Sequence, residues 1–88
     1  MAKSFNSIVT IMSILDSENH TKTIPVEVRY TNTDVFEVLD VRMNGYSKID
    51  GVLHTPGKSI SSDFIDHYCV DYKNYSCFCE DIKQLSKI

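Results

Sequence analysis

Alanine and leucine, the apolar residues that most favour helices, are scarce in this sequence. The 88 residues include one alanine and four leucines, whereas isoleucine and valine together number seventeen. β-Branched side chains lose rotamer freedom in a helix and pack well on the pleated surface of a sheet. The composition therefore predicts a β-rich domain, and the length predicts one domain, residues 1–88, with a single modest core.

The sequence also lacks the short motifs that carry catalysis. Its three glycines form no glycine-rich phosphate loop, there is no His-Glu-x-x-His helix, and no Ser or Cys stands in a recognisable nucleophile turn. The three histidines, His20, His54 and His67, lie far apart along the chain. We expect no enzymatic activity, and we assign no catalytic residue and no cofactor.

Long apolar runs are absent too. No segment approaches the ~20 apolar residues that a membrane-spanning helix needs. The apolar run from Ile8 to Leu15 has the look of a signal peptide, but Thr10 and Ser13 interrupt it and no small-residue cleavage site follows. We therefore expect a soluble, cytoplasmic protein with no membrane association.

Basic residues are few and scattered. The formal net charge is −3 and the isoelectric point is near 5.4, which disfavours a nucleic-acid binder, because binding to the phosphate backbone needs clustered Lys and Arg. Lysine outnumbers arginine seven to two beside many Ile, Ser, Asn and Asp. This bias is typical of AT-rich coding in low-GC bacteria and their phages.

The first hairpin is the clearest element. Phe5 to Leu15 is rich in β-branched residues and apolar on both alternating faces, which predicts a strand covered on both sides; a helix capped by Ser4 is the alternative. The polar segment 16–22 forms the turn, and Thr23 to Tyr30 alternates as a second strand. Pro25 lacks an amide proton, so this strand is expected to begin there or to lie at an edge.

Two further strand segments follow. Val35 to Met43 is predicted as a strand because of its valines, although a helix capped by Thr33 and stopped by Gly45 also fits its pattern. Asp50-Gly51 is the best type I′ turn signal in the chain, since both central residues of that turn need positive φ. It predicts a short ribbon that pairs residues 46–49 with residues 52–55.

The stretch from His67 to Cys79 is the densest in large apolar residues and thiols. It fits a hairpin that turns at Lys73 and Asn74, and it also fits a helix whose stripe comprises Phe64, Tyr68, Tyr72, Tyr75, Cys79 and Ile82. Tyr, Cys, Val and Phe have low helix propensity. We therefore predict the hairpin.

Together these segments predict an α+β, β-rich fold of mostly antiparallel hairpins with a short C-terminal helix, Glu80 to Ile88. Ser62 is expected to cap one helical turn at residues 63–66. The alternative is a three- to four-stranded sheet packed by one long helix, residues 62–86.

Four residues resemble a metal-ligand set: His67, Cys69, Cys77 and Cys79. Thiolates and an imidazole suit zinc, but this spacing is not a common zinc knuckle, and the two-residue hairpin would turn His67 and Cys69 away from the other two. An odd number of thiols without a secretion signal also argues against disulfides. We predict free, metal-free thiols and keep a small zinc-binding domain as a distant alternative.

Acidic residues surround tyrosines between Asp63 and Asp81. This segment has five acids and one Lys, a balance that repels phosphate and suits a basic protein partner. Tyrosines supply contact area in interfaces. The predicted partner-binding residues, which we call the Tyr/acid surface, are Asp63, Asp66, Tyr68, Asp71, Tyr72 and Tyr75. The competing interpretation is that the tyrosines belong to the core and the acids keep the domain soluble.

The sequence thus favours a small acidic, non-enzymatic protein-binding module. A phage or bacterial inhibitor or accessory protein acting on a basic partner protein fits its size and charge. The alternative function is that of a structural or assembly protein that forms homo-oligomers through an uncovered sheet edge.

Overall fold

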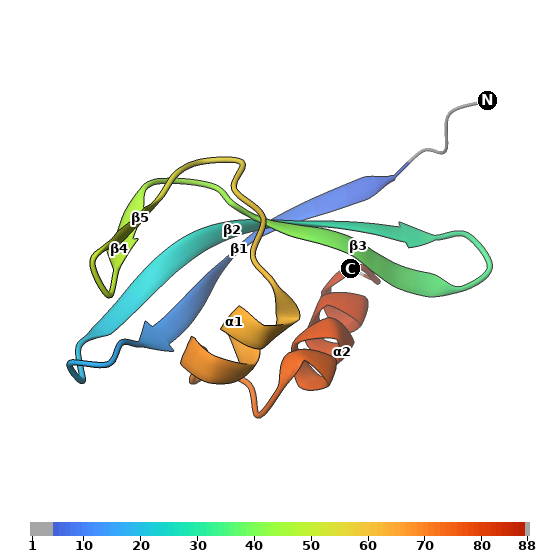
Figure 1. Cartoon of the computed structure of the whole chain (residues 1–88). Coiled ribbons are helices and arrows are strands. Elements are labelled where there is room, and N and C mark those ends of the chain that lie inside the picture. The colour runs from blue at the N-terminus through green and yellow to red at the C-terminus, as the bar shows by residue number, and fades with distance from the viewer. Residues whose placement is uncertain (1–4, 88) are drawn as a thin grey trace.

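A three-stranded antiparallel sheet carries the fold, with a small two-stranded ribbon beside it and two helices on one face (Figure 1). The computed structural model describes residues 5–87. The elements in chain order are β1 (Asn6–Leu15), β2 (Thr21–Asn32), β3 (Phe36–Met43), β4 (Ser47–Ile49), β5 (Val52–His54), α1 (Ser62–Tyr68) and α2 (Tyr75–Leu85). The strand order in the larger sheet is β1-β2-β3. The β-rich α+β prediction is confirmed.

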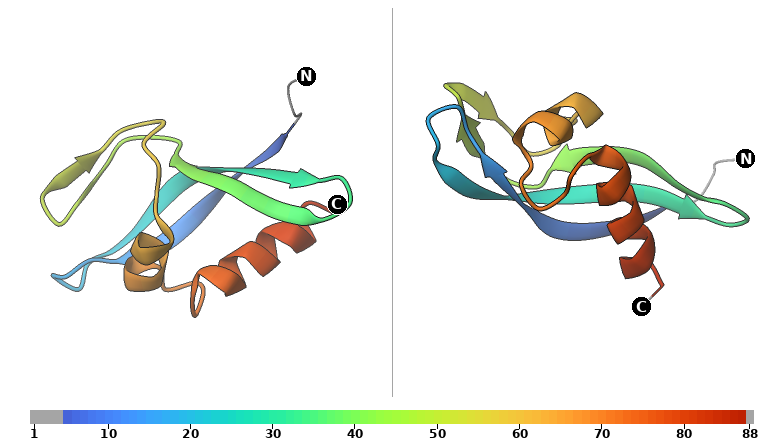
Figure 2. Two further views of the ribbon diagram at one scale, coloured as in Figure 1. Left: turned by 45° about the vertical axis from the view of Figure 1, so that its right-hand side comes forward. Right: turned by 90° about the horizontal axis from the view of Figure 1, so that it is seen from below.

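The core lies between the sheet and the helices. Successive side chains of a strand point to opposite faces, so alternate residues of β1, β2 and β3 face α1 and α2. Figure 2 shows both helices on the same face of the sheet. The buried apolar residues are Met12, Ile14, Ile24, Val26, Val28, Tyr30, Val41 and Met43 from the sheet, and Ile49, Ile60, Ile65, Cys69, Phe78 and Ile82 from the segments that follow it.

The first hairpin forms as predicted, with Asn6 to Leu15 pairing with Thr21 to Tyr30. The carboxylate of Asp16 accepts hydrogen bonds from the amides of Glu18 and His20 and so closes its turn. The prediction that the first strand is covered on both faces is wrong. Val9 and Ile11 are 59% and 66% exposed, because the helices cover only the face on which Met12 and Ile14 lie.

Pro25 does not mark the start or the edge of its strand, since β2 begins at Thr21 and is the central strand. The amide and carbonyl of one strand residue point to the same side, and the Pro25 carbonyl accepts from the Asn44 amide at 2.9 Å. The Pro25 nitrogen, which carries no proton, therefore points toward the residue after Met43, where β3 has already ended. A central strand accommodates proline there because no ladder hydrogen bond is lost.

The later strands are confirmed. Residues 35–43 contain β3, and the ribbon pairs Ser47 to Ile49 with Val52 to His54. Asp50 and Gly51 have φ of 50° and 81°, which are the positive values that a type I′ turn requires.

The predicted hairpin from His67 to Cys79 is wrong. The chain instead forms α1, a six-residue linker and α2, so the helical alternative is right about the stripe but wrong about one unbroken helix. The Ser61 side chain accepts from the Phe64 amide and caps α1, and the Asn74 side chain accepts from the Cys77 amide and caps α2. Lys73 and Asn74 are therefore part of a helix start, and burial against the sheet outweighs the weak helix propensity of these residues.

The C-terminal helix is longer than predicted and begins earlier, at Tyr75 instead of Glu80. Its predicted last residue, Ile88, lies outside the described residues. The helical turn at 63–66 also extends further, to Tyr68, with Ser61 in place of Ser62 as its cap. In both helices the packing of one apolar side on the sheet lengthens an element that local signals alone made short.

Candidate functional site

The Tyr/acid surface lies on the helical layer. Asp63, Asp66 and Tyr68 belong to α1, Asp71 and Tyr72 to the linker, and Tyr75 opens α2. The three aspartates are exposed and the three tyrosines are half-buried. The six residues therefore all lie within residues 63–75 of the helical layer, with the carboxylates exposed and the aromatic rings half-buried.

Tyr68 ties α1 to the tips of two hairpins. Its hydroxyl donates to a carboxylate oxygen of Asp50 at 2.7 Å, and its ring packs against Phe64 at 4.7 Å between centroids. The same carboxylate accepts from the amide and the hydroxyl of Ser17. The hydrogen bond from Tyr68 lowers the pKa of Asp50 most, and the hydrogen bonds from Ser17 lower it further. The hydrogen bond to Asp50 raises the pKa of Tyr68.

Tyr72 and Tyr75 pack on either side of the buried Phe78 ring. Tyr72 meets that ring edge-on at 5.4 Å and donates its hydroxyl to Asp81 at 2.6 Å, while Tyr75 stacks on it at 6.2 Å. Burial first, and then the bond to Asp81, raises the pKa of Tyr72. Burial raises the pKa of Tyr75 to about 12, aided by its hydrogen bond with Cys79. Both phenols are therefore neutral hydrogen-bond donors at physiological pH.

Two of the three aspartates also hold the fold together. Asp66 accepts from the amide of Tyr75, the first residue of α2, at 2.7 Å, and Asp71 accepts from the amide of Ser13 on β1 at 2.7 Å. Asp63 is exposed in the first turn of α1, where a negative charge is favourable for the helix dipole. Sequence reasoning missed the roles of Asp66 and Asp71, because their partners lie 9 and 58 residues away.

The residues of the candidate zinc set do not converge. Cys69 is buried, Cys79 is half-buried and Cys77 is exposed, and all three thiols are free. Burial raises the pKa of Cys69 and Cys79. Within residues 5–87 no three His, Cys, Asp or Glu side chains are grouped so that they could hold a metal ion.

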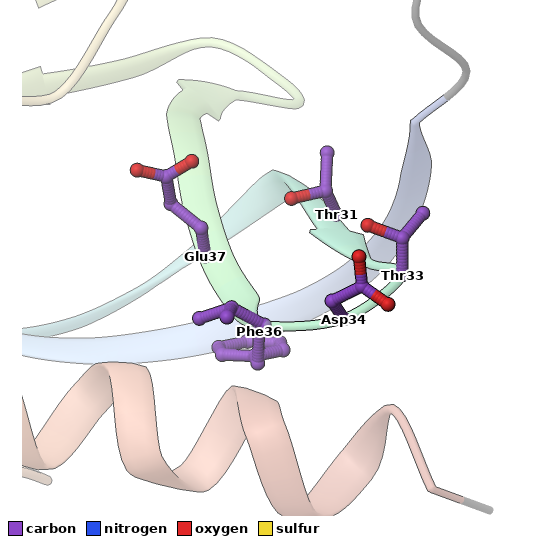
Figure 3. A pocket seen from close by; sticks show the side chains of 6 residues that line it. Thr31, Thr33, Asp34, Phe36 and Glu37 are labelled. Carbon is purple, nitrogen blue, oxygen red and sulfur yellow. The ribbon is translucent and has the colours of Figure 1, made fainter.

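A small hollow lies at the turn between β2 and β3. It is lined by residues 31 and 33–37, and Figure 3 shows Glu37 and Phe36 on opposite sides of the sheet, with Phe36 toward α2. Its polar lining consists of the hydroxyls of Thr31 and Thr33 and the carboxylates of Asp34 and Glu37. We found no helix in the described part of the chain that is long and apolar enough to cross a membrane.

Comparison with known proteins gives no relative on which to base a function. No protein-family model, no curated protein and no solved structure matches the chain. The functional assignment therefore depends on the surfaces that this fold exposes and on their charge.

Proposed function

We propose that the protein is a small non-enzymatic binding module whose helical layer docks on a basic surface of a partner protein. The observation that carries this proposal is the charge of that layer. Asp63, Asp66, Asp71 and Glu80 are exposed there. Lys73 is the one Lys or Arg between Asp63 and Asp81, and Lys83 follows in the last turn of α2. A one-sided field of this kind attracts a basic partner and raises the rate of encounter.

The tyrosines supply the second part of an interface. The rings of Tyr72 and Tyr75 pack against Phe78, and both side chains remain partly exposed. A ring that is already held in one rotamer loses little conformational entropy on binding, and tyrosine is enriched among residues that dominate binding energy. The acids are therefore expected to govern association, and the tyrosines to govern dissociation.

The biological setting is part of the same proposal. A chain of this size, acidity and lysine-rich bias fits an inhibitor or accessory protein of a phage or a low-GC bacterium, acting in the cytoplasm. Its acidic helical layer disfavours a nucleic-acid ligand, because the phosphates would be repelled.

The test uses the two charges of α1, Asp63 and Asp66, and leaves Asp71 unchanged so that its contact with Ser13 on the β1 edge stays as it is. Asp63→Asn with Asp66→Asn removes two charges from neighbouring positions on one helix face. Asn at position 66 keeps an oxygen for the Tyr75 amide. The matched control is Asp34→Asn with Glu37→Gln, which removes the same charge at the β2–β3 turn; Glu37 points away from α2 (Figure 3).

The full chain is first used to capture proteins from a bacterial lysate, and association with the purified partner is then measured at low and high salt. We expect the α1 variant to associate more slowly and with a flatter salt dependence, while the control variant behaves like the wild type. Capture that does not depend on Asp63 and Asp66, or equal association rates for both variants, would contradict the proposal. Circular dichroism checks that each variant is folded.

A second function, assembly through a sheet edge, is favoured by one specific feature of the structure. The outer edge of β1 is open along half of its length, as described below.

A further inference from the structure

The two edges of the three-stranded sheet differ in how far other segments of the chain cover their backbone groups. The edge of β3 is closed at one end by the segment 57–60: the Met43 amide donates to the Lys58 carbonyl and the Ile60 amide donates to the Val41 carbonyl, both at 2.8 Å. Its other end carries Glu37 and Asp40 and a register shift opposite Arg29 and Tyr30. Covering segments, charges and bulges are the usual means by which an edge avoids pairing with another chain.

In the described part of the chain, the edge of β1 is covered only at its C-terminal end. There the Ser13 carbonyl accepts from the Val70 amide at 3.0 Å, its amide donates to Asp71, and Ile14 forms a bridge with Cys69. Ser13 thus points its backbone polar groups away from β2. In an antiparallel ladder every second residue does the same, so the amides and carbonyls of Ser7, Val9 and Ile11 also point outward.

Nothing in residues 5–87 protects the N-terminal half of this edge. Within residues 5–87, no hydrogen bond outside the β1–β2 ladder engages the backbone of Ser7, Val9 or Ile11. From Phe5 to Leu15 the chain has no charged residue and no proline, which are the residues that keep exposed edges from pairing. The side chains of Val9 and Ile11 add exposed apolar surface on the face without helices.

We propose that this edge binds a second copy of the same chain, with the two β1 strands antiparallel and Val9 opposite Val9 of the other copy. This register is the one that pairs all three open residues, since it sets Ser7 against Ile11 and stops before Ser13, which is already occupied. Each of these pairs then exchanges two backbone hydrogen bonds. The result is one continuous sheet built from both copies.

A second copy fits this edge because the strand is self-complementary. The segment is uncharged, so pairing it with itself brings no like charges together, and β-branched cross-strand pairs such as Val9 with Val9 stabilise a sheet. The neighbouring charges on the same face are compensated within each copy: Arg29 pairs with Glu27 at 3.3 Å, and Arg42 pairs with Asp40. The two faces can therefore lie side by side without electrostatic repulsion.

Dimerisation through β1 rests on the second proposed function, assembly, for which it names the contact. It is independent of docking on a basic partner, because it uses the sheet edge and not the helical layer. A two-fold axis through the Val9 pair runs perpendicular to the sheet, so both helical layers come to the same side of the dimer. A monomeric chain would still present the Tyr/acid surface. Failure of one proposal therefore leaves the other standing.

The test is the solution mass of the full chain from micromolar to millimolar concentration, by sedimentation equilibrium. We expect a dimer whose dissociation constant rises by about tenfold or more in Val9→Lys and in Val9→Glu, because each places like charges directly opposite each other. An equimolar mixture of the two variants should recover the dimer, since the unlike charges then face each other. The control, Val35→Lys, changes a residue that is 73% exposed in the β2–β3 turn and should dimerise normally.

Hydrogen exchange gives a second readout that does not depend on a substitution. The amides of Ser7, Val9 and Ile11 should exchange more slowly as the protein concentration rises, while the amides of the β4–β5 turn should not change. A monomer at all concentrations overturns the proposal. So does a dimer that Val9→Lys leaves intact, because another strand or face would then form the contact.

Discussion

Replacing Gly51 isolates the energy of a backbone conformation from that of side-chain contacts. Gly51 has φ of +81°, and a Cβ atom at this position would meet no heavy atom within 4 Å. A β-branched residue would therefore be strained only through its backbone, which costs roughly 1–2 kcal/mol in the left-handed region. We expect Gly51→Val to lower the free energy of unfolding by about this amount.

This strain should affect the whole domain, because the turn is tied to it. Ile49, two residues earlier, is 2% exposed in the core, and Asp50 holds both Tyr68 and Ser17. In a domain of this size 1 kcal/mol corresponds to a change in Tm of roughly 4–8 °C. Thermal unfolding followed by circular dichroism, with urea unfolding for the free energy, measures the effect.

Two other substitutions sharpen the interpretation. Gly51→Asn should cost much less than Gly51→Val, because Asn tolerates positive φ. Gly45→Ala tests the opposite situation: Gly45 has no positive φ, but its Cβ would lie 3.0 Å from Cγ of Pro25. Equal Tm values for Gly51→Val and the wild type, or an equal loss for Val and Asn at position 51, would refute the reasoning.

Three further predictions concern the core, an edge contact and pH. Phe78→Ala should destabilise the domain by about 3–5 kcal/mol, because it empties the site on which two tyrosines pack; urea unfolding measures this, and a loss below 1 kcal/mol would show that the site refills. Asp71→Ala should cost about 1–3 kcal/mol, because the Ser13 amide loses a charged acceptor, and Asp71→Asn should cost less; equal losses would contradict the role of the bond. The Nδ1 atom of His54 is buried and has no hydrogen-bond partner within residues 5–87, and desolvation lowers the pKa of His54. The imidazole of His54 binds a proton more readily in the unfolded chain than in the folded one. The free energy of unfolding is therefore highest above pH 6.5, the ordinary pKa of His, and decreases as the pH falls below 6.5. In His54→Phe this part of the pH dependence, measured by urea unfolding, should disappear.

The sheet was predictable because its signals are local. The alternation of Ile24, Val26 and Val28 specifies one buried face, and the Asp50-Gly51 pair specifies a turn that only residues tolerant of positive φ can form. Residue spacing alone did not reveal which face of β1 the helices cover. Val9 and Ile11 are as apolar as Met12 and Ile14, and only the position of α1 and α2 separates the two pairs.

The helical layer was mispredicted because its stability is tertiary. The stretch of Tyr, Cys and Phe has weak helix propensity, and it becomes helical because Phe78 and Ile82 are buried against the sheet. One local signal was overlooked: Asn is a favoured N-cap residue, and the side chain of Asn74 accepts from the Cys77 amide at the start of α2. The hairpin interpretation used Asn74 as a turn residue instead. The same error hid Asp66 as the acceptor for the first amide of α2.

The Tyr/acid surface was proposed from composition alone, and composition could not predict which residues its tyrosines contact within the fold. Tyr68 bonds to Asp50 and Tyr72 to Asp81 across 18 and 9 residues. Both tyrosines pack against the core, while Asp50 is exposed and Asp81 is half-buried. The two competing interpretations of this segment, core and interface, are therefore compatible with each other.

The association rate of the Asp63→Asn, Asp66→Asn variant with the captured partner, at low and at high salt, tests the central proposal most directly. Docking of a basic partner on the helical layer predicts slow association of this variant at low salt, a difference from the wild type that shrinks at high salt, and a normal rate for Asp34→Asn, Glu37→Gln. Identical association rates for the wild type and the α1 variant at both salt concentrations would show that the helical acids do not face the partner, and would contradict the proposal.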